Sequence, residues 1–364
     1  MSRTIHVDLG SRSYDIIIKE NSLADISEYV WSLGLGKRGI IITNDVVSRW
    51  YLDPVARSLE QAGFVMEQFI LPDGEQTKCL DWLDKVYHAM LKARLDRNSF
   101  VVALGGGVVG DLAGFAAATY MRGIPFIQVP TTLLAQVDSS VGGKTGVNLK
   151  EGKNLVGAFY QPKCVVIDPL VLRTLEKREL RAGFAEVIKY GVIRDEVFFR
   201  YLEDNITDIF NLKPDCIEHI ISVSCRIKAE VVAKDECEAG LRAILNFGHT
   251  AGHALEAICG YGKLVHGEGV GIGMAVACSL GQMCTGFASE STDRIKQLIR
   301  ESGLPYRVPA GIASDLIIEY MRRDKKTAND TIRFVLPVKI GDVTMVDTVS
   351  DKDIATAIEA NKDT

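Results

Sequence analysis

Between residues 37 and 169, short apolar runs alternate with amphipathic stretches that have helical spacing. The apolar runs predict strands at 38–45, 64–71, 99–107, 124–130 and 164–169, because turn-forming residues bound each of them. The amphipathic stretches predict helices at 46–63 and 79–95. This alternation predicts a largely parallel sheet with helices on its faces and with its ligands at the carboxyl ends of the strands.

The spacing of apolar residues changes after about Leu175. Helical spacing dominates from there, and strand signals return only at 331–347. A chain of 364 residues is long for one core. We therefore expect an α/β protein with a mostly parallel sheet domain at 1–175 and a mainly helical domain at 176–364. The first domain should begin with a strand hairpin within 1–21.

Composition excludes some classes of function. The formal net charge of −5 argues against a general nucleic-acid binder. We find no apolar stretch that predicts a membrane span and no apolar core of a signal peptide near the N-terminus. The eight cysteines form no C-x-x-C pair, which favours reduced thiols. We expect a cytoplasmic protein.

A glycine-rich turn, "GGGVVGD" at 105–111, follows the predicted strand 99–107. Gly105, Gly107 and Gly110 fit the G-x-G-x-x-G spacing that lets a diphosphate approach the N–H groups of a helix start. An ordinary dinucleotide domain has this turn after its first strand. Here it comes about a hundred residues into the chain. Either it is only a tight turn, or the chain binds a dinucleotide in a different topology.

Two neighbouring segments carry polar groups. "DGEQTK" at 73–78 is typical of a turn with a helix cap, but Glu75 and Lys78 could supply ribose contacts. The segment 129–159 has no clear amphipathic pattern, and it contains Asp138, a Gly-Gly-Lys turn and Lys153-Asn154. A loop of that length is uncommon unless it binds something, and its spaced lysines suit a phosphorylated ligand.

Three of the six histidines, His249, His253 and His266, fall within a short stretch. Two histidines with a carboxylate such as Glu186 could hold a divalent metal and leave positions open for substrate oxygens. Spacing does not decide which two histidines ligate. Lys189 lies on the same predicted helix face as Glu186. This half also contains polar groups that, taken one by one, are typical of a solvated helix face: Lys228, Arg242, Asn246 and the pair Lys325-Lys326.

Together these motifs resemble the 3-dehydroquinate synthase family. The similarity includes "DGEQTK", "GGGVVGDLAGFAAATYMRGI", "QVPTTLLAQVDSSVGGKTGVN", "AGFAEVIKYG", "NFGHTAGHALE", "HGEGVGIGM" and "RDKK", in the family's order over nearly the whole chain. The resemblance implies a Rossmann-like NAD-binding domain of atypical topology, with the glycine turn as its pyrophosphate site. The second domain would then bind metal and substrate.

The resemblance also assigns roles to residues. It implies that zinc or cobalt is held by Glu186, His249 and His266, with His253 as a substrate-facing acid/base group. The implied NAD contacts are Asp73, Gly74, Glu75, Gln76, Thr77, Lys78, Gly106, Gly107, Val108, Val109, Gly110, Asp111, Thr131, Thr132, Lys144, Lys153, Val171, Leu172, Arg173 and Thr174. The implied substrate contacts are Lys144, Asn154, Asn246 and His253 at the phosphate, Lys228 and Arg242 at a carboxylate, and Lys189 and one of Lys325-Lys326 nearby, with Asp138 in support. The sequence departs from the family pattern at Asn44-Asp45, where the family often has an acid one position earlier, so no adenosine contact is assigned there.

The activity implied by the resemblance is the conversion of 3-deoxy-D-arabino-heptulosonate 7-phosphate into 3-dehydroquinate and phosphate. A homodimer is also implied, with Arg122 donated across the interface. Other sugar-phosphate cyclases are the nearest alternative, but their substrates lack the carboxylate for which Lys228 and Arg242 are suited. A metal-dependent polyol dehydrogenase would produce NADH in net amounts, and a non-catalytic NAD sensor would not need the metal ligands.

Overall fold

The computed structural model describes residues 2–260, 263–324 and 332–363. These residues form two compact units, Met1–Glu176 with Ile217–Cys237 and Lys177–Cys216 with Glu238–Thr364. The first boundary lies next to the one expected from sequence, but the segment Ile217–Cys237 groups with the first unit. The reason is its packing: within that unit, Cys225 Sγ lies 3.1 Å from the carbonyl oxygen of Gln136 and donates to it.

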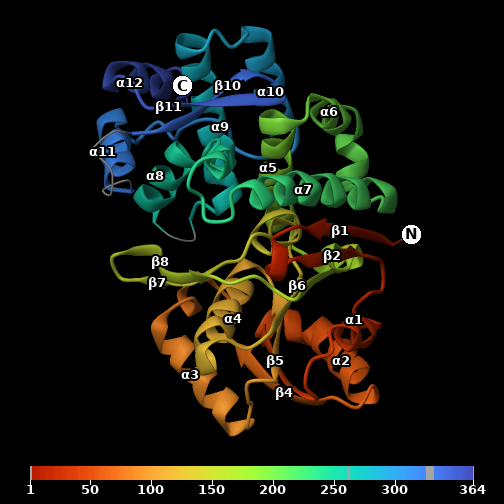
Figure 1. Ribbon diagram of the computed structural model, residues 1–364. Helices are drawn as coiled ribbons and strands as arrows, with labels where there is room; N and C mark the ends of the chain where they lie inside the picture. Colours follow the sequence, from red (N-terminus) through yellow and green to blue (C-terminus); the bar gives the residue numbers. More distant parts are fainter. Residues whose placement is uncertain (1, 261–262, 325–331, 364) are drawn as a thin grey trace. The chain divides into compact units, whose positions relative to one another are not determined.

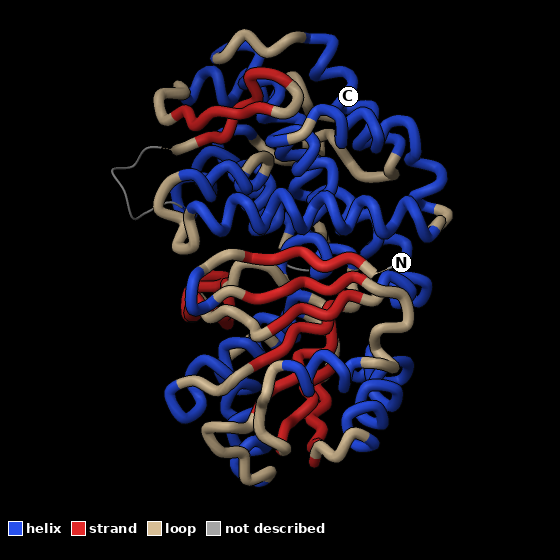
Figure 2. Tube along the Cα trace, turned by 45° about the vertical axis from the view of Figure 1, so that its right-hand side comes forward, coloured by secondary structure: helices blue, strands red, loops and turns tan. Residues whose placement is uncertain are grey.

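The first unit is built on a seven-stranded sheet in the order β1-β2-β9-β6-β5-β3-β4 (Figures 1 and 2). Its strands are β1 (Arg3–Val7), β2 (Tyr14–Ile18), β3 (Arg38–Asn44), β4 (Val65–Leu71), β5 (Phe100–Gly105), β6 (Phe126–Pro130) and β9 (Cys164–Ile167). The pairing is parallel from β2 to β4, and β1 pairs with β2 antiparallel. The parallel sheet and the N-terminal hairpin predicted from sequence are confirmed.

Helices cover both faces of this sheet (Figure 1). They are α1 (Ile26–Ser32), α2 (Asp45–Gln61), α3 (Leu80–Lys92) and α4 (Gly107–Thr119). Successive residues of β5 point to opposite cores: Phe100 and Val102 pack with α1 and α2, whereas Val101 and Ala103 pack with α3 and α4. Burial on both faces explains why the central strands are continuous apolar runs.

The segment 129–159 differs from the patternless loop that its sequence predicts. It folds as a π-helical turn, η4 (Ala135–Ser139), followed by the antiparallel hairpin β7 (Lys144–Leu149) and β8 (Gly152–Phe159). A register shift between Val147 and Leu149 and the largely unburied surface of β8 remove the alternation that would have predicted strands.

The second unit is mainly helical, as expected (Figure 2). It contains α5 (Lys177–Arg194), α6 (Glu196–Phe210), α8 (His249–Cys259), α9 (His266–Cys284), α10 (Ser289–Glu301), α11 (Ser314–Asp324), α12 (Asp351–Glu359) and the hairpin β10 (Phe334–Lys339) with β11 (Asp342–Val346). Helix α7 (Pro214–Lys234) begins in this unit and continues into the first. Helix α9 is buried along nearly its whole length and is the centre of the core. Among the described residues, no helix is both long and apolar enough to cross a membrane.

Candidate functional site

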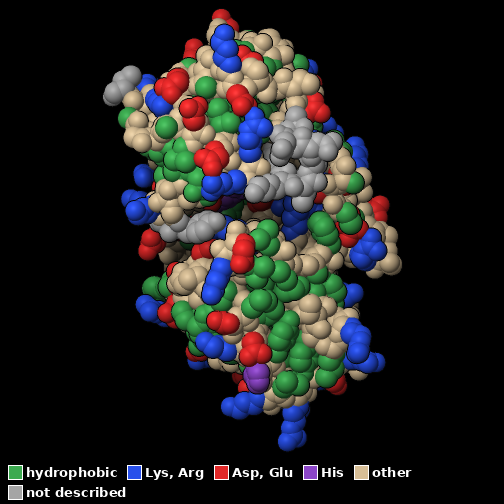
Figure 3. All heavy atoms as spheres, turned by 90° about the vertical axis from the view of Figure 1, so that its left-hand side faces the viewer, with side chains coloured by type: hydrophobic (Ala, Val, Ile, Leu, Met, Phe, Trp, Pro, Cys, Tyr) green, Lys and Arg blue, Asp and Glu red, His purple; other side chains and the backbone are tan. Residues whose placement is uncertain are grey.

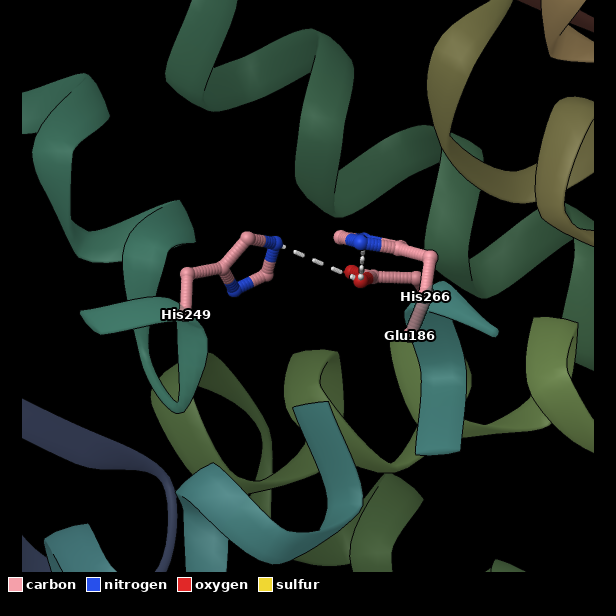
Figure 4. Close-up of side chains that lie close together, drawn as sticks. All are labelled: Glu186, His249 and His266. Carbon is pink, nitrogen blue, oxygen red and sulfur yellow. Dashed lines mark ion pairs between the residues drawn. The ribbon is translucent and has the colours of Figure 1, made fainter. Parts of the chain in front are cut away.

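Three side chains from three helices of the second unit meet in one cluster (Figure 4). Glu186 lies in the middle of α5 and is completely buried, while His249 and His266 are the first residues of α8 and α9. The Nε2 atoms of His249 and His266 lie 3.5 and 3.3 Å from Oε1 of Glu186. The structure therefore brings together the three residues that the resemblance assigns to a metal.

The other ring nitrogen of each histidine already has a partner. His249 Nδ1 lies 3.0 Å from the carbonyl oxygen of Phe247, and His266 Nδ1 lies 3.0 Å from Oε1 of Glu256. Both partners are acceptors, so each Nδ1 donates and each Nε2 faces Glu186, where its lone pair is available to a metal once the ring has lost any second proton. Metal-ligating histidines show this pattern, in which an outer acceptor fixes the tautomer. The donor set therefore fits a divalent cation such as zinc or cobalt.

A second group of donors, His253, Glu256 and His266, shares one ring with the first. Glu256 is already the hydrogen-bond acceptor for His266 Nδ1, so using it as a ligand would remove the contact that orients that ring. The ring of His253 lies 5.3 Å from that of His249 and 5.8 Å from that of His266, centroid to centroid. The geometry favours Glu186, His249 and His266 as the ligand set, with His253 beside it.

Burial strongly perturbs the cluster. Burial lowers the pKa of His249 to about 3. Burial also disfavours the charged form of His266, but hydrogen bonds with Glu186 and Glu256 outweigh it and raise the pKa of His266 to about 10. Lys189, one turn from Glu186 on α5, forms an ion pair with it. In the absence of a metal, these cationic groups compensate the buried Glu186 carboxylate, and a divalent cation bound there would displace the second proton of His266.

Glycines of α9 let the three helices approach closely enough to form this cluster. A Cβ added to Gly267 would lie 1.9 Å from the carbonyl oxygen of Ala182 on α5. A Cβ on Gly273 would lie 1.8 Å from the carbonyl oxygen of Gly248, directly before α8. Since real Cβ atoms do not come so near to backbone, only glycine permits these two contacts.

The glycine turn lies at the carboxyl end of β5, in the first unit. Gly106 is the N-cap of α4, so the unpaired N–H groups of the helix start are at this turn. A Cβ on Gly110 would lie 2.8 Å from Oε1 of Gln128 on β6, so a larger residue there would displace the buried Gln128 amide between α4 and the sheet. The direction in which successive strands are added to the sheet also reverses here. From β3 the chain continues to β4 on one side, whereas from β5 it continues to β6 and β9 on the other side. In open α/β sheets, such a reversal is where ligands bind, which explains the late position of the turn.

Lys78 joins three of the sequence motifs. Its buried Nζ lies 2.5 Å from Oδ2 of Asp111 and 2.6 Å from Oδ1 of Asn154. Asn148 Nδ2 on β7 donates to Oε1 of Glu75 at 2.7 Å. The 73–78 turn, the start of α4 and the β7-β8 hairpin are therefore one hydrogen-bonded assembly.

Other predicted contacts of this unit lie around the same strand ends. Thr131 N–H donates to the carbonyl oxygen of Gly105, and Thr132 Oγ1 accepts from Ala135 N–H. Asn44 Nδ2 donates to Oδ1 of Asp73 at 2.5 Å, and Asp73 N–H donates to Oδ1 of Asp45 at 3.1 Å. Asn44 and Asp45, where the sequence departs from the family pattern, thus stabilise the 73–78 turn through direct hydrogen bonds with Asp73.

The segment 171–174 is less accessible than its predicted role suggests. Val171 and Leu172 are buried in the core, so their side chains pack against protein, whereas Arg173 and Thr174 are exposed. Val109 of the glycine turn is also buried. A cofactor could meet Val109, Val171 and Leu172 only through their backbone.

The remaining predicted residues fall into separate surroundings. Lys228 Nζ on α7 donates to both Oδ1 and the carbonyl oxygen of Asp138 at 2.7 Å, within the first unit. In the second unit, Arg242 is buried and Asn246 Nδ2 donates to Oε1 of Glu238 at 3.0 Å. Lys144 is exposed and Lys153 half-buried on the hairpin. Lys325 and Lys326 lie outside the described residues.

Sequence reasoning missed two supporting groups. Glu256 orients His266, and Asn148 joins the hairpin to the 73–78 turn. A signal for Glu256 was available, because its spacing of seven from His249 and three from His253 puts all three on one face of α8. Asn148 gave no signal, since its role depends on a register shift in the hairpin.

Comparison with known proteins agrees with this geometry. Residues 68–182 match the family model described as 3-dehydroquinate synthase N-terminal, and residues 183–327 match 3-dehydroquinate synthase C-terminal. A 3-dehydroquinate synthase of Picosynechococcus sp. is 51% identical over 352 residues, covering 96% of each chain.

Solved structures of other sugar-phosphate cyclases are also similar. A 2-epi-5-epi-valiolone synthase from Streptomyces hygroscopicus with NAD⁺ and Zn²⁺ bound has a TM-score of 0.88 at 27% identity, covering 95% of this chain and 96% of its own. A 2-deoxy-scyllo-inosose synthase complexed with carbaglucose-6-phosphate, NAD⁺ and Co²⁺ has a TM-score of 0.87 at 27% identity, covering 99% and 100%. The chain belongs to the 3-dehydroquinate synthase family.

Proposed function

We propose that this chain is a 3-dehydroquinate synthase, a phosphorus–oxygen lyase that uses NAD⁺ and a divalent metal ion. The substrate is 3-deoxy-D-arabino-heptulosonate 7-phosphate, and the products are 3-dehydroquinate and phosphate. The observation that carries the proposal is sequence identity of about half, over nearly the full length, to 3-dehydroquinate synthases, in a chain that also has the buried Glu186, His249 and His266 cluster.

The chemistry divides between bound groups and the chain. Bound NAD⁺ would supply a reversible hydride acceptor, and a metal held by Glu186, His249 and His266 would supply a Lewis acid for the substrate hydroxyls. Oxidation of the C5 alcohol acidifies the C6 proton, so phosphate can leave from C7. After the hydride returns to C5, the ring opens and the resulting enolate closes on the ketone.

The residues of the chain position the reactants and neutralise charge. Glu186, His249 and His266 would hold the metal, and His253 beside them would move a proton on the substrate. The starts of α4 and of the 73–78 turn would hold NAD⁺, with Lys78 and Asp111 fixed against each other. Lys144, Asn154 and Asn246 would contact the substrate phosphate, and Lys228 and Arg242 its carboxylate.

The nearest alternative is a cyclase for a sugar phosphate without a carboxylate. The 2-deoxy-scyllo-inosose synthase named above binds carbaglucose-6-phosphate, which has no carboxylate, and shares the fold, but at 27% identity it is far more distant than the 3-dehydroquinate synthases. The buried guanidinium of Arg242 also favours an acidic substrate, because a planar fork matches a carboxylate in two hydrogen bonds.

We further propose a cytoplasmic homodimer. All eight cysteines are free, as in proteins of reducing compartments. Hydrophobic side chains gather on one face of the first unit (Figure 3), and Leu155 and Phe159 of β8 and Met121 are exposed at 60%, 47% and 40%. Exposed apolar surface of this kind marks interaction sites. Arg122, next to Met121, is exposed and would complete the partner's active site.

The deciding experiment is an assay of phosphate release. The purified protein, supplied with the heptulosonate phosphate, zinc or cobalt and a trace of NAD⁺, is expected to release phosphate continuously without accumulating NADH, because each hydride returns within one turnover. A parallel sample stripped of metal by a chelator is expected to be inactive until metal is added back. NADH formed in step with substrate consumption would instead identify a polyol dehydrogenase, and full activity after verified metal depletion would contradict the ligand assignment.

A further inference from the structure

A cavity of about 340 Å³ lies within the second unit and does not include any residue of the Glu186 cluster. Its walls come from α10, from Tyr306 and Arg307 shortly after it, and from Asn361 just beyond α12. The volume falls in the range of about 300–1,000 Å³ typical of small-molecule sites. The lining is polar, which suits a small hydrophilic ligand better than an apolar one.

Two cations in this lining have no partner of their own. The side chains of Lys296 and Arg300 form no hydrogen bond or ion pair with any described residue, although Asp293 also lines the cavity. They are four residues apart on α10, which places like charges one above the other and destabilises the helix. An arrangement that costs stability in the ligand-free protein has a physical reason if an anion binds between the two cations.

Arg307 and Tyr306 add donors to the same wall. Arg307 Nε donates to the Tyr306 hydroxyl at 3.3 Å, and Nη1 of the same residue donates to the carbonyl oxygen of Lys362 at 3.1 Å. Because the Tyr306 oxygen accepts from Arg307, its own O–H is directed elsewhere and can donate to a ligand.

The local electrostatics point the same way. Burial lowers the pKa of the Lys296 ammonium, so this charge is incompletely compensated. The hydrogen bond from Arg307 lowers the pKa of Tyr306, as expected next to a concentration of positive charge. An anion in the cavity would relieve both effects.

We propose that this cavity is a second ligand site, which binds a small phosphorylated molecule through Lys296, Arg300 and Arg307. Three cations against the carboxylate of Asp293 leave a formal charge of about +2, which matches the dianion of a phosphate monoester at neutral pH. The cavity is roomier than free phosphate requires, so the ligand is assigned as a phosphate ester of a small polar compound.

The test is calorimetric titration of the holoenzyme, loaded with NAD⁺ and metal, at constant ionic strength. Glucose 6-phosphate and inorganic phosphate are the two probes, and they distinguish an ester site from a site for free phosphate. The variant Lys296→Gln/Arg300→Gln is compared with wild type and with Lys339→Gln/Lys352→Gln, which removes the same charge from exposed positions of the same unit outside the cavity. Wild type and the control are expected to bind one more equivalent of glucose 6-phosphate than the cavity variant, or to bind it there at least about tenfold more tightly.

Thermal unfolding provides a readout that does not depend on activity. Removing the like-charge pair is expected to raise the Tm of the ligand-free protein slightly, while the Tm increase caused by glucose 6-phosphate becomes smaller. A purely structural role for the two cations would lower the ligand-free Tm instead. Equal stoichiometry and affinity in all three proteins, or equal losses in the control, would overturn the proposal. Binding of inorganic phosphate alone would overturn the assignment to an ester.

Discussion

The tautomers of His249 and His266 decide what the Glu186 cluster can bind. The acceptor beside each Nδ1 sets the tautomer. This acceptor is the carbonyl oxygen of Phe247 for His249 and the carboxylate of Glu256 for His266. Glu256 is thus a positioning residue, whose effect reaches the proposed metal through the His266 ring. Such outer partners typically change metal affinity by about 10- to 100-fold when they are replaced.

We expect Glu256→Gln to weaken zinc binding by about tenfold, because a neutral amide oxygen is a poorer acceptor for His266 Nδ1. The measurement is competitive titration of the apoprotein with a zinc-binding dye. Glu256→Asp, which keeps the charge, is expected to recover part of the affinity, and Glu290→Gln, at an exposed position of α10, serves as the unaffected control.

Replacement of His253 distinguishes the two possible ligand groups. If Glu186, His249 and His266 hold the metal, His253→Gln keeps near-normal zinc affinity while Glu186→Gln loses it. The opposite pattern would assign the metal to His253, Glu256 and His266.

Arg242 is the residue that we expect to select the substrate. Arg242→Ala leaves the substrate carboxylate poorly paired in a partly dry site, at a cost of roughly 2 to 5 kcal/mol in transition-state stabilisation. The loss should fall on the heptulosonate phosphate and spare sedoheptulose 7-phosphate, which has no carboxylate. Values of kcat/KM for both compounds with wild type, Arg242→Ala and Arg242→Lys test this. An unchanged ratio in the alanine variant would show that Arg242 does not contact the carboxylate.

Helix α9 is the element on which the cluster depends. Its glycines allow α5 and the start of α8 to approach its backbone, and these neighbours bring Glu186 and His249 to His266. Sequence patterns predicted this helix correctly, but its low amphipathicity gave no indication of which faces it buries. A helix buried all round has no polar face to reveal its orientation.

We expect Gly273→Ala to destabilise the protein by about 3 kcal/mol or more, because the new methyl group would overlap the carbonyl oxygen of Gly248. Zinc affinity should fall as well, since His249 follows Gly248 directly. The measurements are thermal unfolding and zinc titration, with Gly311→Ala as the matched control, because a Cβ there meets no atom within 4 Å. A stable variant with intact zinc binding would mean that the backbones of α8 and α9 can separate without cost.

At the scale of the whole molecule, the proposed homodimer has a direct consequence for activity. The exposed apolar side chains of β8 and of Met121 support the proposal of a subunit interface on the first unit. If Arg122 acts in the partner's site, the Arg122→Ala and Arg242→Ala homodimers should both lose most of their activity on the heptulosonate phosphate. A mixture of the two, unfolded and refolded together, should form hybrid dimers that each contain one intact site.

We expect this mixture to regain about a quarter of the wild-type specific activity, because half of randomly formed dimers are mixed and each has one functional site of two. The measurement is phosphate release before and after co-refolding, together with the solution mass. An active monomer, or a mixture no more active than its parts, would contradict the role of Arg122 across the interface.

The sequence by itself determined the local structure and the family. The spacing of apolar residues in strands and helices is a short-range property of the sequence. It therefore predicted the sheet of the first unit, its N-terminal hairpin and the helical second unit. The motifs from "DGEQTK" to "HGEGVGIGM" identified the family because their residue types and order are specific. The resemblance named Glu186, His249 and His266 as the proposed metal ligands, while spacing alone left His249, His253 and His266 equivalent.

Only the tertiary structure decided which of these groups meet. The position of β5 between β3 and β6 places the glycine motif at the reversal of the sheet, which is where ligands bind in open α/β sheets. The packing of α7, not its sequence, assigned Ile217–Cys237 to the first unit. Glu186 and His266 are far apart in sequence, and no local pattern encodes their contact. It arises from close backbone approaches at Gly267 and Gly273, which depend on the shape of the neighbouring helices and therefore exist only in the folded chain.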